Sequence, residues 1–242
     1  NRIRAKYFVV ATGSSPMVPP IPGLADVPFH TNESIFDVDQ TIDHLIVVGG
    51  GPIGLEMAQA HRRLGARVTV VEMFSILGKD DLEAADVVRR RLQAEGIEIL
   101  EQTKVSAVSG SAGAITVEVE SGEGARSEVT GSHLLVAGGR KPNLDGLDLE
   151  AAGIDYAPQG IKVDARLRTS NRRIFAIGDV RGGLQFTHTA GYDAGIVIRN
   201  ALFKLPAKAN YAAAPWVTYT DPELAHVGLD EKAAAEKLGA GK

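Results

Sequence analysis

Apolar runs in this chain alternate with segments whose apolar positions have helical spacing. The clearest series starts with an apolar run at 45–48, continues through a helical segment and reaches a second apolar run at 68–71. A second helical segment at about 81–95 and a third apolar run then follow. Gly65 and Gly96 come directly after the helical segments and are expected to end them. The pattern therefore predicts a βαβαβ unit with a parallel sheet.

The spacing of apolar residues also predicts which side of each helix packs on the sheet. In both helical segments apolar residues recur at intervals that place them on one face of an α-helix. The residues expected to face inward are Ile53, Met57, Ala60 and Leu64 in the first helix, and Leu82, Ala85 and Leu92 in the second.

Shorter elements are expected on both sides of this unit and within it. They are a strand at 7–11, a proline-rich connector at 15–23, a hairpin of strands at 104–108 and 114–120, a strand at 134–137, a strand at 174–177 with a helix at about 190–203, and a new strand at 216–220. The strands at 7–11 and 174–177 each end in a glycine-containing turn, yet neither begins a complete βαβ unit. We therefore expect both strands to belong to one discontinuous domain whose first part lies upstream of Asn1.

The turn between the first strand and first helix of the βαβαβ unit has the spacing of a dinucleotide-binding motif. Gly49 is expected to allow the tight turn, Gly51 to let the backbone approach a pyrophosphate, and Gly54 to let the helix pack closely on the sheet. Glu72 ends the second strand about 20 residues later, where a carboxylate binds the ribose hydroxyls of NAD and repels the 2′-phosphate of NADP. These residues predict an NAD site, with NADP less favoured. An ordinary strand, turn and helix without a ligand is the alternative.

Composition narrows the possible functions. Apolar residues make up 44% and charged residues 23% of the 242 residues, as in soluble globular proteins. The net charge of −4 argues against a nucleic-acid partner, and no apolar run is long enough for a membrane span or a signal peptide, so we expect a cytoplasmic protein. No cysteine is present, which excludes thiol chemistry within these residues, and the six histidines lack the spacing of metal ligands. No metal site is expected.

Further motifs occur in a fixed order along the chain. They are Ala11-Thr12-Gly13-Ser14, Gly138-Gly139-Arg140-Lys141-Pro142-Asn143, Ile177-Gly178-Asp179 and Thr220-Asp221-Pro222-Glu223. Together with the glycine turn, they make the chain resemble the FAD-dependent pyridine nucleotide-disulfide oxidoreductases, the family of dihydrolipoamide dehydrogenase, glutathione reductase and mercuric reductase. The resemblance covers nearly the whole chain. It implies an α/β fold in which a Rossmann-like NAD-binding domain is inserted in a partial FAD-binding domain of the three-layer ββα type.

The resemblance implies where FAD would bind. The counterpart of Asp179 accepts hydrogen bonds from the ribityl chain, and the backbone of residues 185–188 would meet the flavin ring at a helix N-terminus, whose dipole stabilises negative charge. Without a cofactor, Asp179 would be a turn or N-cap residue and His188 would cap the helix or face solvent. The residues implied to bind FAD are Thr12, Gly13, Ser14, Asp179, Gln185, Phe186, Thr187 and His188.

The resemblance also extends the NAD site. Glu56 is the candidate catalytic residue, because its counterpart pairs with a lysine beside the flavin. That lysine is not in this chain, so Glu56 is expected to be an unpaired carboxylate in the first turn of its helix. Val105 and Gly139 match positions at the adenine and nicotinamide ends of NAD, and Pro52 stands where some members carry an aromatic gate. The residues implied to bind NAD are Gly49, Gly50, Gly51, Pro52, Ile53, Gly54, Glu56, Glu72, Val105 and Gly139.

The resemblance assigns a domain to each part of the chain. The expected parts are a partial FAD-binding domain and connector at 1–41, an NAD(P)-binding domain at 42–139, the C-terminal part of the FAD-binding domain at 140–212, and the start of a truncated dimerisation domain at 213–242. The first FAD glycine motif, the redox-active cysteine pair and the distal His-Glu pair of the family are not in the sequence. We therefore expect a fragment of a longer enzyme.

The expected parent is a homodimeric flavoprotein oxidoreductase. It would transfer hydride from NAD(P)H to FAD and on to a disulfide, a lipoyl group or a metal ion such as Hg(II). The fragment itself is expected to be inactive, with a competent NAD site and weak or absent FAD binding. A stand-alone NAD-binding module without catalysis is the alternative.

Overall fold

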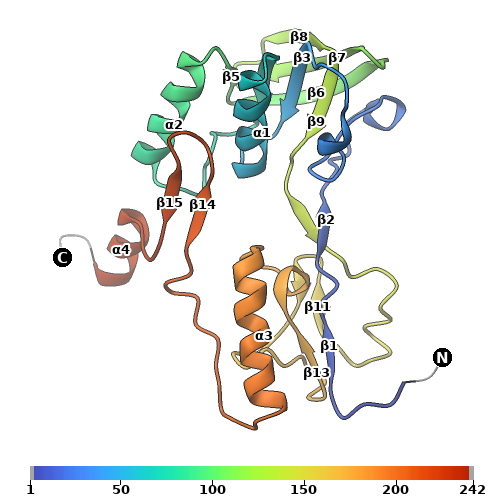
Figure 1. Cartoon of the computed structure of the whole chain (residues 1–242), viewed down its shortest axis with the longest axis vertical. Helices are drawn as coiled ribbons and strands as arrows, with labels where there is room; N and C mark the ends of the chain where they lie inside the picture. The colour runs from blue at the N-terminus through green and yellow to red at the C-terminus, as the bar shows by residue number, and fades with distance from the viewer. Residues whose placement is uncertain (1–2, 240–242) are drawn as a thin grey trace. The chain divides into compact units, whose positions relative to one another are not determined.

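The computed structural model describes residues 3–239 and contains two compact units (Figure 1). Unit 1 comprises residues 1–15 and 140–214, and unit 2 comprises residues 16–139 and 215–242. The connector at 16–41 and the C-terminal segment therefore pack with the expected NAD(P)-binding domain. The assignment of each part to a functional domain stays a prediction.

A parallel sheet of four strands forms the centre of unit 2. In spatial order its strands are β5 (Glu98–Leu100), β4 (Arg67–Val71), β3 (His44–Val48) and β9 (His133–Val136). Helix α1 (Pro52–Arg63) connects β3 to β4, and helix α2 (Leu82–Ala94) connects β4 to β5. The expected βαβαβ unit is confirmed. Both helices end where glycine follows, because Gly65 and Gly96 adopt positive φ angles of 104° and 85°.

Helix α1 buries a different face from the one expected. Leu55 and Ala58 are fully buried against the sheet, whereas Leu64 is 80% exposed. Met57 and Ile53 are only partly buried, and Ala60 is exposed. The cause is Gly54, which brings the helix so close to the sheet that a Cβ at this position would lie 2.0 Å from the carbonyl oxygen of Gly49. Because Gly54 faces the sheet, the residues one turn later on the same side of the helix also face the core, and Ala58 is one of them.

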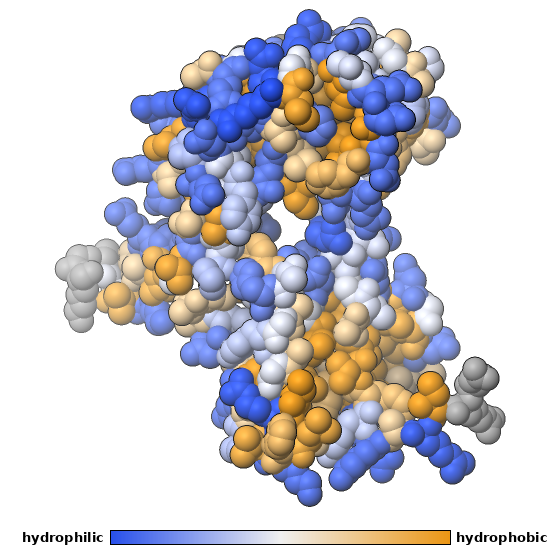
Figure 2. Space-filling model, in the orientation of Figure 1, coloured by the Kyte–Doolittle hydropathy of each residue, from blue (hydrophilic) through white to orange (hydrophobic). Residues whose placement is uncertain are grey.

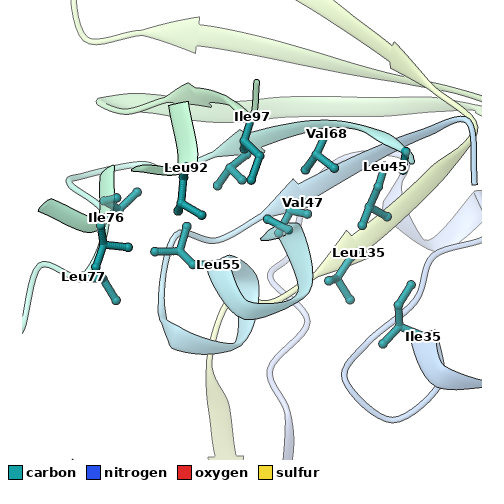
Figure 3. Packing of buried hydrophobic residues seen from close by; sticks show 14 of the residues in the cluster. Ile35, Leu45, Val47, Leu55, Val68, Ile76, Leu77, Leu92, Ile97 and Leu135 are labelled. Atoms are coloured by element: carbon teal, nitrogen blue, oxygen red, sulfur yellow. The ribbon is translucent and has the colours of Figure 1, made fainter. Parts of the chain in front are cut away.

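Helix α2 follows the expected pattern except in its first turn. Ala85 and Leu92 are buried as expected, and Val88 completes the inward stripe. Leu92 shares a core cluster with Leu55 of α1 (Figure 3). The expectation for Leu82 is wrong, because this side chain is 74% exposed. Leu82 is the first residue of the helix and lies before the point where the helix meets the apolar cluster.

An antiparallel sheet of three strands is inserted after β5. Its strands are β6 (Thr103–Ser111), β7 (Ala114–Ser121) and β8 (Arg126–Gly131). The expected hairpin is confirmed, and it is longer than expected. Sequence reasoning missed β8, whose side chains are mostly exposed and polar, so that the strand lacks an apolar run.

The C-terminal segment of unit 2 forms a hairpin and a helix. Strand β14 (Trp216–Thr218) pairs with β15 (Leu224–His226), and helix α4 (Glu231–Leu238) follows. The hairpin is held on α1 by Gln59, whose side-chain amide donates to the carbonyl of Asp221 at 2.9 Å and accepts the Asp221 N–H at 2.7 Å. Arg63 adds an ion pair to the Asp221 carboxylate at 2.6 Å. The hairpin and α1 are thus joined by both backbone and side-chain bonds.

Unit 1 is built around two parallel strands and a helix. Strand β1 (Phe8–Val10) pairs with β13 (Ile174–Ala176), as their shared domain predicts. Helix α3 (Thr187–Ala201) starts three residues before the expected position. The Thr189 hydroxyl stabilises this earlier start, because it bonds both the N–H and the carbonyl of Phe186.

Short elements complete unit 1. They are strand β2 (Ser14–Pro16), whose last residue is counted in unit 2, paired with β10 (Arg140–Pro142); strands β11 (Tyr156–Ala157) and β12 (Gly160–Ile161), which pair; and the 3-10 turn η3 (Gly178–Arg181). The expected connector of unit 2 contains two more such turns, η1 (Leu24–Asp26) and η2 (Ile35–Asp37).

The surface is largely hydrophilic on the face shown in Figure 2, with separate apolar patches. Phe8 and Val9 of β1 stay 44% and 47% exposed, so this strand is only partly covered by the described residues. Within residues 3–239, no helix has the length and apolar character needed to cross a membrane.

Candidate functional site

The glycine turn after β3 has the geometry that the motif predicts. Gly49 has a φ of 116°, and a Cβ there would lie 2.5 Å from the carbonyl oxygen of Ala137, so only glycine fits without strain. Gly54 packs directly on Gly49. At Gly51, by contrast, an added Cβ would meet no atom within 4 Å. The turn is therefore closed on the sheet side and open at Gly51.

Glu72 is fixed beside this turn by two backbone N–H groups. Its Oε2 accepts the Gly50 N–H at 2.6 Å, and its Oε1 accepts the Phe74 N–H at 2.8 Å. Gly50 allows this approach, because a Cβ there would lie 3.0 Å from the Cβ of Glu72. A carboxylate offers about four acceptor sites, so these two bonds orient Glu72 and leave capacity for the hydroxyls of a ribose.

The start of α1 supplies donors next to this carboxylate. Pro52 is the first helical residue and has no N–H to satisfy. The N–H groups of Ile53 and Gly54 lie in the first turn, where they have no acceptor within the helix. Unpaired donors, the positive end of the helix dipole and open space at Gly51 together fit the pyrophosphate of a dinucleotide.

Two other residues expected to bind NAD lie outside the glycine turn, although Gly139 directly follows Gly138, whose backbone N borders Gly49. Val105, in β6, is partly buried against the apolar cluster beneath the antiparallel sheet. Gly139 follows β9 with a φ of 111°, and its carbonyl accepts the Met17 N–H at 2.9 Å. Their contacts with NAD stay predictions.

Glu56 has a partner, contrary to expectation. Its Oε1 accepts the backbone N–H of Tyr219 at 2.8 Å, and Glu56 is the fifth residue of α1 rather than part of its first turn. The expectation of an unpaired carboxylate is therefore wrong, because the C-terminal hairpin supplies a donor. Its role beside a flavin stays a prediction.

The residues implied to bind FAD gather around a cavity of about 410 Å³ in unit 1. It lies where β1 and β13 end and α3 begins. Its lining residues are Ala11, Gly13, Arg140, Ile177, Gly178, Asp179, Gln185, Thr187 and Ala190. A helix N-terminus and a carboxylate at the carboxyl ends of parallel strands provide the donor and acceptor groups that a flavin nucleotide needs, so the residues present fit this cofactor.

Asp179 is oriented by a serine and an arginine. The Ser14 hydroxyl donates to Asp179 Oδ2 at 2.6 Å and accepts from Arg140 Nε at 2.7 Å. Arg140 also donates to the Ser14 carbonyl at 2.7 Å and lies 3.9 Å from the Asp179 carboxylate. Sequence reasoning placed Arg140 only in a connecting motif, and its position at the start of the short strand β10 carried no signal for this role.

Thr12 lies in the same segment and pairs with Asn143. The Thr12 hydroxyl donates to the Asn143 carbonyl at 2.8 Å, and the Asn143 side chain returns a bond to the Thr12 carbonyl at 2.9 Å. At the helix end of the cavity, the Phe186 and His188 rings are stacked with centroids 5.4 Å apart. The expected FAD residues of the two sequence segments that form unit 1 thus lie close to one another.

A buried network behind the cavity holds the turn that carries Asp179. Asp193, on α3, has no exposed surface and accepts the Gly178 N–H at 3.0 Å and Arg181 Nε at 2.6 Å. The Tyr211 hydroxyl donates to the same carboxylate, and the Arg181 guanidinium lies 4.5 Å from the Tyr211 ring centre. Burial and the bond to Asp193 raise the pKa of Tyr211 well above its usual range. Sequence reasoning missed this network, although an aspartate on the inward face of an apolar helix is a usable signal.

Comparisons with known proteins agree with this geometry. Residues 1–194 match the family described as pyridine nucleotide-disulphide oxidoreductase. The chain belongs to this family. The expected resemblance and the Rossmann-like α/β fold are thereby confirmed.

The similarity extends along nearly the whole chain. The chain is 37% identical over 239 residues to a mercuric reductase of Bacillus cereus, covering 98% of this chain and 38% of the relative. It is 35% identical over 233 residues to a dihydrolipoyl dehydrogenase of Chlorobaculum tepidum, covering 95% of this chain and 49% of the relative. The chain thus spans less than half the length of these two relatives.

A solved structure shares the fold. The Cu(II) complex of the HOCl-induced flavoprotein disulfide reductase RclA from Escherichia coli superposes with a TM-score of 0.88 at 31% identity, covering 97% of this chain and 54% of that chain.

Proposed function

We propose that this chain provides the nicotinamide-nucleotide site and part of the flavin site of an NAD(P)H-dependent flavoprotein oxidoreductase. The observation that carries the proposal is the Glu72 carboxylate, which is held by the N–H groups of Gly50 and Phe74 beside an open glycine turn. A bound flavin would supply the capacity to accept hydride and pass electrons onward.

The residues of unit 2 would bind and orient the dinucleotide. The first-turn N–H groups of α1 would hold the pyrophosphate, and Glu72 would accept hydrogen bonds from the adenosine ribose. The fixed carboxylate disfavours a 2′-phosphate through like-charge repulsion, and the residues directly after it include no arginine to compensate. We therefore propose NAD(H) as the preferred nicotinamide cofactor.

The residues of unit 1 would orient the flavin nucleotide. Asp179, held by Ser14 and Arg140, would accept hydrogen bonds from the ribityl hydroxyls. The N–H groups at the start of α3 would stabilise negative charge on the ring system.

The electron acceptor of the whole protein is also a proposal. Relatives named mercuric reductase and dihydrolipoyl dehydrogenase support a metal ion such as Hg(II), a lipoyl group or another disulfide. A homodimeric state and a cytoplasmic location stay predictions from the sequence.

Binding measurements on this chain test the proposal. Calorimetric titration should show one site for NADH and an affinity for NADPH at least about tenfold weaker, which corresponds to about 1.4 kcal/mol. Equal affinity for the two would overturn the selection by Glu72, and binding of neither would overturn the site itself. FAD is titrated in a separate experiment. The sequence predicts weak or absent FAD binding.

A stand-alone NAD-binding module is the second candidate, supported by the completeness of the βαβαβ unit within one compact unit. It requires NADH binding without electron transfer. Reduction of ferricyanide by NADH after incubation with FAD would exclude the module, whereas NADH binding with no reduction fits both the module and an inert fragment of the enzyme.

A further inference from the structure

Unit 1 contains a second cavity at the opposite end of its two parallel strands. The flavin-site cavity is lined by residues that follow β1 and β13, such as Gly13 and Asp179. The second cavity is lined by residues that precede the same strands, together with Arg168. Because β1 and β13 are parallel, the two cavities lie at opposite edges of this sheet. The second cavity is therefore separate from the site already described.

This cavity has a volume of about 430 Å³ and a strongly cationic lining. Its lining residues are Lys6, Tyr7, Arg168, Arg172 and Arg173, and no carboxylate is among them. None of its cationic side chains forms an ion pair within residues 3–239. Like charges gathered in one hollow repel one another, so the arrangement favours a bound anion.

The carboxylate in the same loop as Arg168 is already engaged. Asp164 Oδ1 accepts the backbone N–H groups of Arg166 and Arg168 at 2.8 and 3.0 Å. It thereby shapes the loop that presents Arg168 and does not pair with the guanidinium. The positive charge in the cavity is left uncompensated by this loop.

Arg168 also has an unsatisfied donor. Its Nε is buried and has no hydrogen-bond partner among the described residues, while the guanidinium lies 5.6 Å from the centre of the fully buried Phe175 ring. The ring packs against the guanidinium, which limits its freedom before any ligand binds. This Nε has almost no accessible surface, so the part of Arg168 that lines the cavity is the rest of its side chain, whose guanidinium carries the positive charge.

We propose that this cavity binds the diphosphate group of a small ligand. Several guanidinium forks and an ammonium in one hollow match a ligand with several negative charges and many acceptor oxygens better than a single carboxylate. The concave shape favours a small molecule over the extended backbone of a nucleic acid. The diphosphate could be inorganic pyrophosphate or part of a nucleotide.

The test compares two double variants that lose the same charge. R168Q/R172Q removes two cations from the cavity, and R90Q/R126Q removes two exposed arginines of unit 2. Calorimetric titration of the 242-residue chain with pyrophosphate should show a saturable site that R168Q/R172Q weakens at least about tenfold and R90Q/R126Q leaves unchanged. The absence of saturable binding, or equal weakening by both double variants, would overturn the proposal.

Additional arms separate the remaining outcomes. If R168Q/R172Q folds poorly, the single variant R172Q replaces it, because Arg172 is exposed and its loss should leave the melting temperature unchanged. R172Q alone should also weaken pyrophosphate binding. Pyrophosphate that binds at the glycine turn instead would be displaced by NADH and unaffected by R172Q, which contradicts the proposal. A titration with ADP in the presence of saturating NADH identifies the source, because R172Q-sensitive binding of ADP that is tighter than that of pyrophosphate indicates a nucleotide and equal binding indicates the inorganic ion.

Discussion

The carboxylate of Asp193 bonds both the backbone N–H of Gly178, at 3.0 Å, and the guanidinium of Arg181, at 2.6 Å. One side chain of α3 thus fixes both ends of the turn that carries Asp179. Because Asp193 is fully buried and the Arg181 side chain is only 9% exposed, neither charge has water as an alternative partner.

Asp193→Asn should therefore destabilise unit 1 strongly. The substitution leaves the Arg181 charge buried without a carboxylate, which typically costs about 3–5 kcal/mol. Urea denaturation monitored by circular dichroism measures the free energy of unfolding. The exposed Asp145→Asn is the control and should stay within about 0.5 kcal/mol of the parent. Similar values for the two variants would contradict the structural role of Asp193.

Glu72→Gln should weaken NADH binding about tenfold, or about 1.4 kcal/mol. The amide keeps one acceptor oxygen but loses the charge and one of the paired bonds to Gly50 and Phe74. NADPH binding should change less, because the repulsion of its phosphate disappears with the charge. Fluorescence titration of both nucleotides measures the ratio of affinities, with the exposed Glu83→Gln as control. An unchanged ratio would argue against selection by Glu72.

Truncation to alanine should affect stability strongly at one leucine of α2 and weakly at another. Leu92→Ala removes a fully buried side chain from the core cluster and should cost about 2–5 kcal/mol. Leu82→Ala removes a side chain that is 74% exposed and should change stability by less than about 0.5 kcal/mol. Chemical denaturation of both variants checks the observed helix face. A large loss of stability in Leu82→Ala would instead support the inward position of Leu82 that the spacing of apolar residues predicts.

Glu95 should make unit 2 sensitive to acid. Hydrogen bonds from Arg63, and further bonds from Arg91 and Gln59, lower the pKa of Glu95 to about 2. A lowered pKa in the folded state means that the carboxylate stabilises the fold above its ordinary pKa of 4.5 and loses this effect as the pH falls toward 2.

Glu95→Gln should thus lower stability at pH 7 and reduce the dependence of stability on pH below about 4.5. Denaturation at a series of pH values measures this, and the exposed Glu123→Gln is the control. A parallel pH dependence in Glu95→Gln and the parent would show that other carboxylates dominate.

Sequence reasoning predicted the order of the βαβαβ strands and helices because apolar runs and glycine stops are local signals. It failed for the buried face of α1, since the approach at Gly54 depends on a missing side chain and not on hydrophobicity. It also missed the partner of Glu56, because the Tyr219 N–H lies 163 residues away in sequence and any residue type could provide it. At Asp193 an aspartate on the inward face of an apolar helix signals a buried polar contact, but the sequence does not show that its partners are Gly178, Arg181 and Tyr211.

The bonds that join the C-terminal hairpin to α1 have a consequence for local opening of the chain. The N–H groups of Tyr219 and Asp221 are both donated to side chains of α1, at Glu56 and Gln59. Both amides should exchange their hydrogens with solvent more slowly while the hairpin stays bonded to the helix whose first turn faces the proposed nucleotide. Deuterium uptake at these two amides therefore reports how often the hairpin detaches from α1. It should slow when a nucleotide stabilises α1.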